Sequence, residues 1–93
     1  MRVVQSRLFK NRIKKFSKSQ KSELDNVIRL LLKHPYSGNK KNGDLKGVFV
    51  YKFKIKNSLF LIAYRFSESL LELIMIGEHE NYYRTLKSYI KNI

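Results

Sequence analysis

The sequence predicts an α+β fold, in which an N-terminal helical hairpin packs on a small, largely antiparallel sheet and a short C-terminal helix follows. Three observations lead to this fold. Apolar residues recur with the period of an amphipathic helix before residue 35 and with the period of a strand after residue 48. A second helical pattern follows Gly77. The 93 residues are enough for one domain, predicted over residues 1–93.

The first segment is predicted to contain an edge strand and a basic helix. Residues 2–5 include a pair of β-branched valines and form the candidate strand. From Ser6 the apolar residues follow one stripe of a helix, at positions i, i+4 and i+7: Phe9, Ile13 and Phe16. The rest of this helix is strongly basic: Arg7, Lys10, Arg12, Lys14 and Lys15.

A second, more apolar helix is predicted to begin at Ser19 or Ser22. Either serine can cap its first turn, where the positive end of the helix dipole favours the acidic side chains of Glu23 and Asp25. Pro35 is expected to end the helix. One apolar face runs along it: Leu24, Val27, Ile28, Leu31 and Leu32. The two helices therefore form a hairpin whose apolar stripes must be covered.

A three-stranded meander is predicted after a loop at residues 36–44, which are rich in Gly, Asn and Lys. Residues 48–56 alternate between aromatic or isoleucine side chains and valines or lysines, as in an amphipathic strand. Residues 59–66 and 70–76 are almost continuously apolar and are typical of buried strands.

Gly77 is expected to break the sheet, and residues 80–90 are expected to form the closing helix. The apolar side chains of that helix predict its inner side: Tyr83, Leu86 and Ile90.

Basic residues dominate the composition, because 20 Lys and Arg face only 7 Asp and Glu, for a formal charge of +13. Such a field attracts phosphate backbones and accelerates encounter with them. An acidic membrane surface would also be attracted, but a membrane-binding protein needs an exposed apolar face beside its charge. The composition therefore predicts a polyanion as partner, RNA before others, and no membrane.

Several classes of protein lack support in the sequence. Cysteine is absent, which fits a reducing compartment, and the N-terminus has no apolar core of signal-peptide length, so a soluble cytoplasmic protein is expected. The longest apolar run, residues 59–64, is too short to cross a bilayer. No phosphate-binding glycine loop, metal-ligand cluster or Ser–His–Asp spacing is present, so no cofactor and no metal are expected.

Three short strings carry a resemblance to a known family. They are GDLKG at residues 43–47, YKFK at residues 51–54 and GEHENYY at residues 77–83. In this order and spacing, and in a chain of this size and charge, they resemble the RelE/ParE superfamily of toxins from bacterial type II toxin–antitoxin pairs. The resemblance covers essentially the whole chain.

This resemblance implies a compact toxin that is inhibited by a cognate antitoxin. In the RelE-like branch, the toxin enters the ribosomal decoding site and cuts mRNA there without a metal. In the ParE-like branch, the same fold poisons DNA gyrase and needs no nuclease residues. The fold alone does not distinguish the two activities, so the residues of the site must be used to distinguish them.

The candidate catalytic residues follow from the chemistry of RNA cleavage, which needs a base for the 2′-hydroxyl, positive charge at the phosphorane and an acid for the 5′-oxygen. Lys52 and Lys54 leave the same face of a strand about 7 Å apart. Because an ordinary lysine is protonated at neutral pH, we expect this pair to hold the phosphate; a solvated strand face is the alternative.

His79 and Tyr83 match two further positions of the family pattern. Histidine titrates near neutrality and suits a general acid or base, although His79 could instead be structural at a helix start. Tyr83 could stack on a base or bind the ribose, but its helical spacing equally suits core packing.

One position departs from the family pattern. Several nuclease members carry an arginine early in the second meander strand, where this chain has Leu61. Arg65, four residues further on the same strand face, could supply the missing cation. If it does not, catalysis is weakened or absent, and gyrase inhibition of the ParE-like kind is favoured. Additional RNA contacts are expected from basic residues around the site: Lys40, Lys41, Lys46, Lys56 and Arg84.

The sequence thus predicts a ribosome-dependent mRNA endoribonuclease. Its expected partners are a cognate antitoxin and mRNA on the ribosome, with 16S rRNA contacts through the basic first helix. Two alternatives remain open at this point. One is a gyrase-inhibiting toxin without nuclease activity, and the other is a non-enzymatic basic RNA-binding protein without toxicity.

Overall fold

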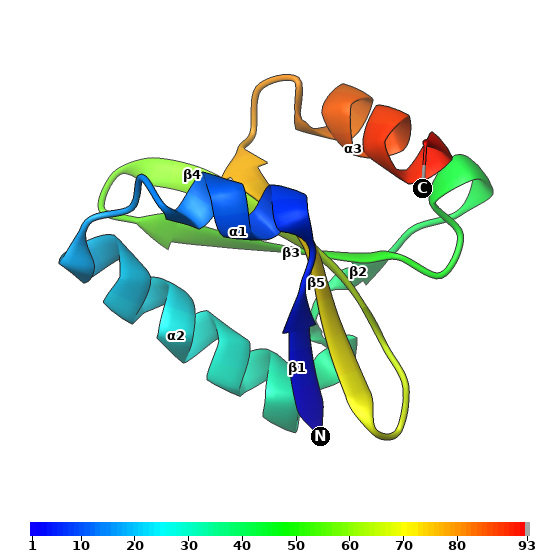
Figure 1. Ribbon diagram of the computed structural model, residues 1–93, viewed down its shortest axis with the longest axis horizontal. Coiled ribbons are helices and arrows are strands. Elements are labelled where there is room, and N and C mark those ends of the chain that lie inside the picture. Colours follow the sequence, from blue (N-terminus) through cyan, green and yellow to red (C-terminus); the bar gives the residue numbers. More distant parts are fainter. Residues whose placement is uncertain (93) are drawn as a thin grey trace.

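Five strands form one mixed sheet in the computed structural model, which describes residues 1–92 (Figure 1). Ile93, the last residue of the domain predicted over residues 1–93, lies outside the described residues. The strand order is β1-β5-β4-β3-β2. The bounds are Arg2–Gln5 for β1, Asn39–Lys40 for β2, Phe49–Ile55 for β3, Ser58–Phe66 for β4 and Leu70–Glu78 for β5. Only the β1–β5 pair is parallel, so the largely antiparallel sheet is confirmed.

Helices cover both faces of this sheet. They are α1 at Arg7–Ile13, α2 at Lys18–Lys33 and α3 at Tyr82–Lys91, with short 3-10 helices η1 at Pro35–Ser37 and η2 at Gly43–Leu45. Figure 1 shows α2 and α3 on opposite sides of the strands. None of these helices has both the length and the apolar character needed to cross a membrane, as far as residues 1–92 show.

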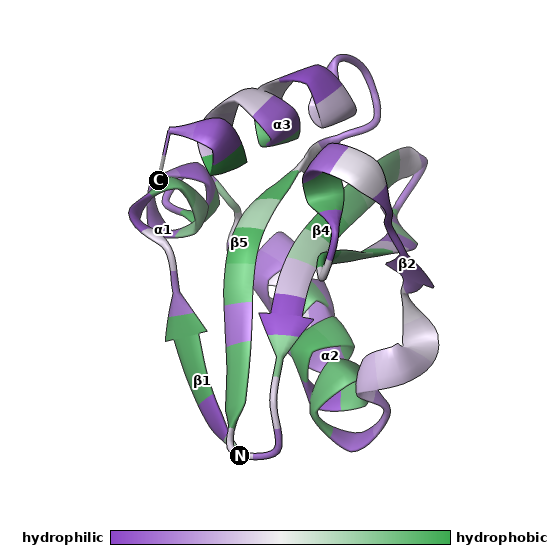
Figure 2. Cartoon of the chain, turned by 90° about the vertical axis from the view of Figure 1, so that its right-hand side faces the viewer, coloured by the Kyte–Doolittle hydropathy of each residue, from purple (hydrophilic) through white to green (hydrophobic). Residues whose placement is uncertain are grey.

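Each face of the sheet has its own apolar core. The core beneath α1 and α2, the hairpin core, contains Phe9, Leu24, Leu31, Phe60, Ile62, Tyr64 and their neighbours. The core beneath α3 and η2, the α3 core, contains Leu45, Val50, Leu61, Ala63, Met75, Tyr82 and Leu86 among others. The central strands β4 and β5 contribute to both cores and are largely apolar along their length (Figure 2). The predicted helical hairpin packed on a sheet is therefore confirmed, and α3 adds a third layer.

The connection between α1 and α2 differs from the prediction. Ser17 caps α2, since its Oγ accepts a hydrogen bond from Gln20 N at 3.2 Å while Gln20 Oε1 accepts one from Ser17 N at 2.8 Å. This reciprocal capping box starts the helix earlier than a cap at Ser19 or Ser22 would. The two acidic residues expected in the first turn therefore lie beyond it: Glu23 and Asp25.

The loop expected at residues 36–44 is partly ordered into secondary structure. It contains most of η1, the two residues of β2 and the start of η2. Strand β2 pairs only with Phe49 and Val50, so the rest of β3 has an open outer edge.

The prediction that Gly77 breaks the sheet was wrong. Gly77 pairs with Leu61, and β5 continues to Glu78. A side chain at position 77 would place a Cβ 2.7 Å from Arg12 Nη1, which is closer than non-bonded atoms approach. The atom that approaches Gly77 is the end of the flexible Arg12 side chain, so a larger residue at position 77 would displace the guanidinium rather than the backbone of α1.

The inner side of α3 also differs from the prediction. The helix starts at Tyr82 instead of residue 80, and Tyr82 is the buried tyrosine, at 2% exposure. Its hydroxyl donates a hydrogen bond to the Met75 carbonyl at 2.7 Å. Leu86 is buried as expected, whereas Tyr83 and Ile90 are only half-buried.

Tyr64 joins η1 to the sheet. Its fully buried hydroxyl donates to the Pro35 carbonyl at 2.6 Å and accepts from Gly38 N at 2.9 Å. Burial raises the pKa of Tyr64, so the hydroxyl keeps its proton. Because Tyr64→Phe would leave both backbone groups without this partner, we expect it to lower the free energy of unfolding in urea by about 1–3 kcal/mol.

The matched control for this change is Tyr36→Phe. Tyr36 is 77% exposed, and its replacement should alter stability by less than about 0.5 kcal/mol. Equal stability of the two variants would show that water or rearranged backbone groups replace the Tyr64 hydrogen bonds.

Candidate functional site

The candidate site begins with two exposed lysines on the open part of β3. Tyr51 and Phe53 pack against the hairpin core, so the alternation of the strand directs Lys52 and Lys54 to the face that carries α3. Lys52 is paired with Leu61 across the ladder. Both lysine side chains are exposed, which leaves their ammonium groups accessible to a polyanion.

His79 lies at the same end of the sheet as these lysines. It directly follows Glu78, the last residue of β5, and its side chain is exposed. The register places Lys52, Leu61 and Gly77 in one row across three strands. The two outer members of the row are therefore two strand spacings apart, about 10 Å. The imidazole and the lysine ammonium groups can thus approach one extended substrate from different sides.

The half-buried Tyr83 is on α3, at the boundary of the α3 core. The ammonium nitrogen of Lys41 lies 5.0 Å from the centroid of its ring, a cation–π contact. Tyr82 cannot replace Tyr83 in contacting a substrate, because the ring of Tyr82 is buried and its hydroxyl donates a hydrogen bond to the Met75 carbonyl. Burial also raises the pKa of Tyr82, which keeps its hydroxyl protonated.

Arg65 is not brought together with the other candidate residues. It shares the strand face of Leu61, as the alternation predicts, but lies four residues, about 13 Å, further along β4. Arg65 Nε donates to Glu72 Oε1 at 2.9 Å. This is the sole ion pair within residues 1–92, and it engages the guanidinium away from the lysines. Leu61 itself is fully buried in the α3 core.

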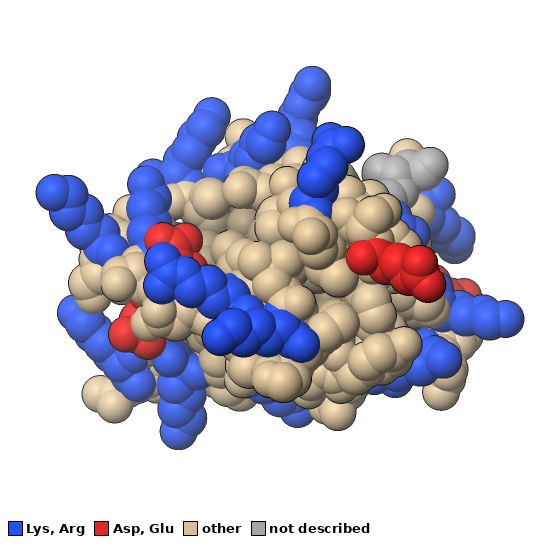
Figure 3. Space-filling view, turned by 90° about the horizontal axis from the view of Figure 1, so that it is seen from below, with Lys and Arg blue, Asp and Glu red and all other residues tan. Residues whose placement is uncertain are grey.

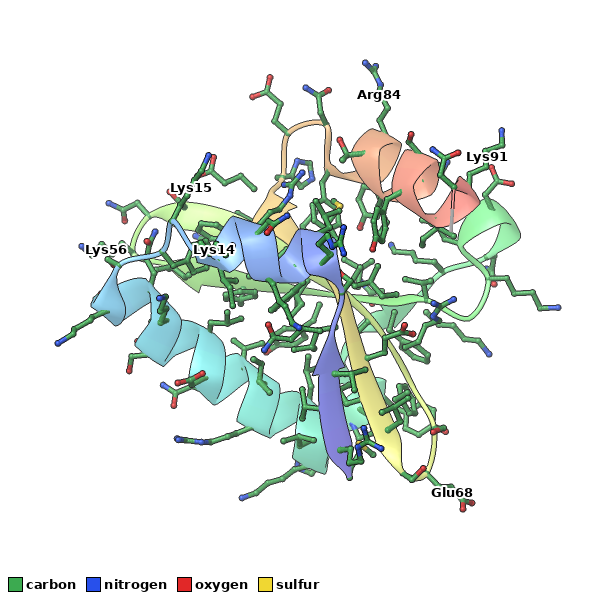
Figure 4. All side chains as sticks on the ribbon, viewed as in Figure 1. Lys14, Lys15, Lys56, Glu68, Arg84 and Lys91 are labelled. Carbon is green, nitrogen blue, oxygen red and sulfur yellow. The ribbon has the colours of Figure 1, made fainter. Side chains whose placement is uncertain are left out.

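The remaining basic candidates form two groups. Lys40 and Lys46 are exposed in the segment before β3, Lys40 on β2 and Lys46 directly after η2. Lys56 lies at the other end of β3, in the turn to β4, with a positive φ of 56°. Figure 4 shows Arg84 directed outward from α3, apart from Lys56.

Arg12 is a cation of this region that sequence reasoning did not single out. Its Nη1 donates to the Ile76 carbonyl at 3.4 Å, and it passes over the backbone of Gly77. Arg12 follows Leu8 by one helical turn, and Leu8 packs against the α3 core. This spacing indicates that Arg12 points to the same side of α1 as Leu8. It does not show that Arg12, among the basic residues of α1, has a functional role.

Positive charge surrounds the molecule on the side opposite α3 as well. In Figure 3 lysine and arginine side chains project around the rim of that face, and carboxylates form only small separate groups among them. No cluster of three or more metal-ligating side chains occurs within residues 1–92. The arrangement therefore offers cations, an imidazole and an aromatic ring to an anionic ligand.

Comparison with known proteins gives one family and several similar folds. A family model described as the ParE-like toxin of the type II bacterial toxin–antitoxin system matches residues 3–87. A search of curated protein sequences gave no match.

Three solved structures share the fold at low sequence identity. The intact E. coli RelBE toxin–antitoxin complex contains a chain that is 15% identical, with a TM-score of 0.66, over 84% of this chain and 95% of that one. The YoeB/ParE toxin from Agrobacterium tumefaciens is 20% identical, with a TM-score of 0.66, over 85% of this chain and 99% of that one. The isolated E. coli RelE toxin is 15% identical, with a TM-score of 0.63, over 92% of this chain and 95% of that one.

Proposed function

We propose that this chain, which belongs to the family of ParE-like toxins of type II bacterial toxin–antitoxin systems, is a ribosome-dependent mRNA endoribonuclease. Residues 1–93 would act as one toxin domain. The observation that carries the proposal is the exposed pair Lys52 and Lys54 at the same end of the sheet as the exposed His79. All three side chains are accessible to an anionic ligand at this end of the sheet.

The proposed reaction is an attack of the ribose 2′-oxygen on the adjacent phosphorus. The P–O5′ bond breaks, which yields a 2′,3′-cyclic phosphate and a 5′-hydroxyl end. Lys52 and Lys54 stabilise the negative charge that develops on the phosphorane. His79 transfers a proton, as general base toward the 2′-hydroxyl or as general acid toward the leaving 5′-oxygen.

Tyr83 would position the nucleotide in this reaction. Its ring is held by Lys41, so the two side chains together offer an aromatic surface and a positive charge to one nucleotide. Arg65 is expected to contribute least among the predicted catalytic residues, since Glu72 engages it at a distance from Lys52. The lysines at positions 40, 46 and 56 and Arg84 would add sequence-independent contacts to RNA.

The cognate antitoxin is proposed to bind across the basic face and the sheet. A chain with a net charge of +13 favours an acidic partner, which would neutralise the field that attracts RNA.

Inhibition of DNA gyrase is the second candidate function. It is favoured by Leu61, which places a buried aliphatic side chain where several nuclease relatives carry an arginine, and by the pairing of Arg65 with Glu72. In this case the exposed lysines would serve binding only, and no nuclease activity would be present.

The test is primer extension on a reporter mRNA translated in a purified system with the wild-type protein or His79→Ala. We expect discrete, translation-dependent breaks with the wild type. His79→Ala should reduce their rate by about 10²–10⁴-fold, the usual contribution of a general acid or base. The matched control is His34→Ala, because His34 is also exposed but lies at the end of α2.

The outcomes separate the two candidate functions. If His79→Ala still produces breaks at the wild-type rate, His79 takes no part in the reaction. Catalysis would then depend on the phosphate-binding lysines. No breaks from a protein that is toxic in cells, together with inhibition of purified gyrase, would refute the nuclease in favour of the second candidate.

A further inference from the structure

A cleft of about 640 Å³ lies next to the candidate site, between α1, the start of α2 and the ends of β4 and β5. Its floor is apolar and includes two aromatic rings. Phe16 and Phe60 meet edge to face, with their ring centroids 5.6 Å apart. Phe60 is nearly buried, whereas Phe16 is half-buried, so Phe16 is the ring that a ligand can contact.

Two amide side chains, Asn11 and Gln20, line the cleft above this floor. Asn11 is exposed. Gln20 uses its Oε1 in the capping box with Ser17, so its NH2 group is left for a ligand. Amide groups of this kind form hydrogen bonds with the polar edges of nucleobases.

Two cations complete the cleft, Arg12 and Lys15. Arg12 is in the last turn of α1, and Lys15 is in the turn that follows the helix. Arg12 Nη1 lies 3.4 Å from the Ile76 carbonyl oxygen and close to Gly77, so the guanidinium lies over the end of β5. Neither cation forms an ion pair within the described part of the chain, so their charge is available to an anion.

We propose that this cleft binds one nucleotide of the RNA strand, beside the phosphate that is cut. The inference rests on the proposed nuclease function. Phe16 would contact the base, the amides of Asn11 and Gln20 its polar edge, and Arg12 with Lys15 the phosphate. Glu78 lines the cleft and His79 is the next residue in the chain. An RNA strand that occupies both sites would therefore pass over the end of β5, from the cleft on the hairpin-core side to the lysines on the α3 side.

Glu78 bears on the choice of ligand. Its carboxylate can accept a hydrogen bond from an exocyclic amino group of a base, whereas the carboxylates of an acidic peptide have no proton to donate to it. Adenine, cytosine and guanine carry such a group and uracil does not. The cleft therefore favours a nucleotide over an acidic protein segment, and it disfavours uridine.

The first experiment measures binding without ribosomes or cleavage. AMP, CMP, GMP and UMP are titrated into the ¹⁵N-labelled protein, and the side-chain amide signals of Asn11 and Gln20 are followed by NMR. We expect saturable shifts of both signals, with UMP the weakest ligand. Lys15→Glu should weaken this binding about tenfold, because it removes a charge-assisted contact and adds a repulsive charge.

Lys14→Glu is the matched control, since it makes the same change of net charge on the neighbouring residue, which does not line the cleft. Figure 4 shows both lysines near the end of α1. Both are exposed, so both variants should keep the wild-type melting temperature. The control should bind within about threefold of the wild type, as expected for a contact screened by solvent.

Three results would overturn the proposal. One is the absence of saturable shifts at Asn11 and Gln20, and another is equal weakening by Lys14→Glu and Lys15→Glu. The third is displacement of all four nucleotides by a short oligoglutamate peptide that binds more tightly, which would make the cleft a protein-docking surface. Because the titration needs no cleavage, failure of the nuclease would appear only in the translation assay, and failure of the subsite only here.

Discussion

Replacing both Lys52 and Lys54 with alanine is expected to reduce mRNA cleavage in the purified translation system by at least about 100-fold. Loss of one donor to a developing oxyanion commonly costs about 10²–10³ in rate, and this change removes both cations of the β3 row. The melting temperature should not fall, because both side chains are exposed and neither contributes to a core. The rate of break formation and the thermal unfolding curve are measured on the same preparations.

The control carries the same change of charge on another surface. Lys18 and Lys21 are exposed on α2, which lies on the opposite side of the sheet, so their joint replacement with alanine should reduce cleavage by less than about tenfold through weaker long-range attraction. Equal losses in the two double variants would mean that the lysines of β3 act only through net charge.

Leu61→Arg is expected to destabilise the protein by about 3–5 kcal/mol, the usual cost of leaving a charge buried without a partner. Leu61 is fully buried in the α3 core, beside Ala63 and Tyr82. A guanidinium at this position would have to displace α3 or remain desolvated. Leu61→Arg should therefore lower stability in urea without raising the cleavage rate.

The control for this change is Leu61→Met, which nearly conserves volume and should cost less than about 1.5 kcal/mol. A Leu61→Arg variant that unfolds like the wild type and cuts mRNA faster would contradict the expectation. It would show that α3 opens readily and that the site lacks a cation in its natural form.

The local pattern was sufficient for the element types but not for every boundary. Alternation along β3 correctly directed Lys52 and Lys54 to one face, because side chains on a strand point to opposite sides in turn. The cap of α2 was misplaced because several serines at its start have the same local chemistry, and only Ser17 has Gln20 three residues later.

Residues whose role depends on distant partners were harder to predict. Tyr82 and Tyr83 have the same side chain at adjacent positions, and the choice of the buried one depends on the docking of α3 against β5. Arg65 could be placed on a strand face but not paired with Glu72, which lies on the adjoining strand β5. Local periodicity contains no information about such contacts.

By itself, the sequence determined the α+β class, the order of the elements, the strong positive charge and the strand face of the two lysines. These properties depend on the period of apolar residues and on composition, both of which are local. Only the tertiary structure decided that Arg12 approaches Gly77, that Leu61 is buried, and that β5 ends at the same end of the sheet as the lysines of β3. The physical reason is that strand register and helix docking result from the packing of both cores together, between residues far apart in the chain.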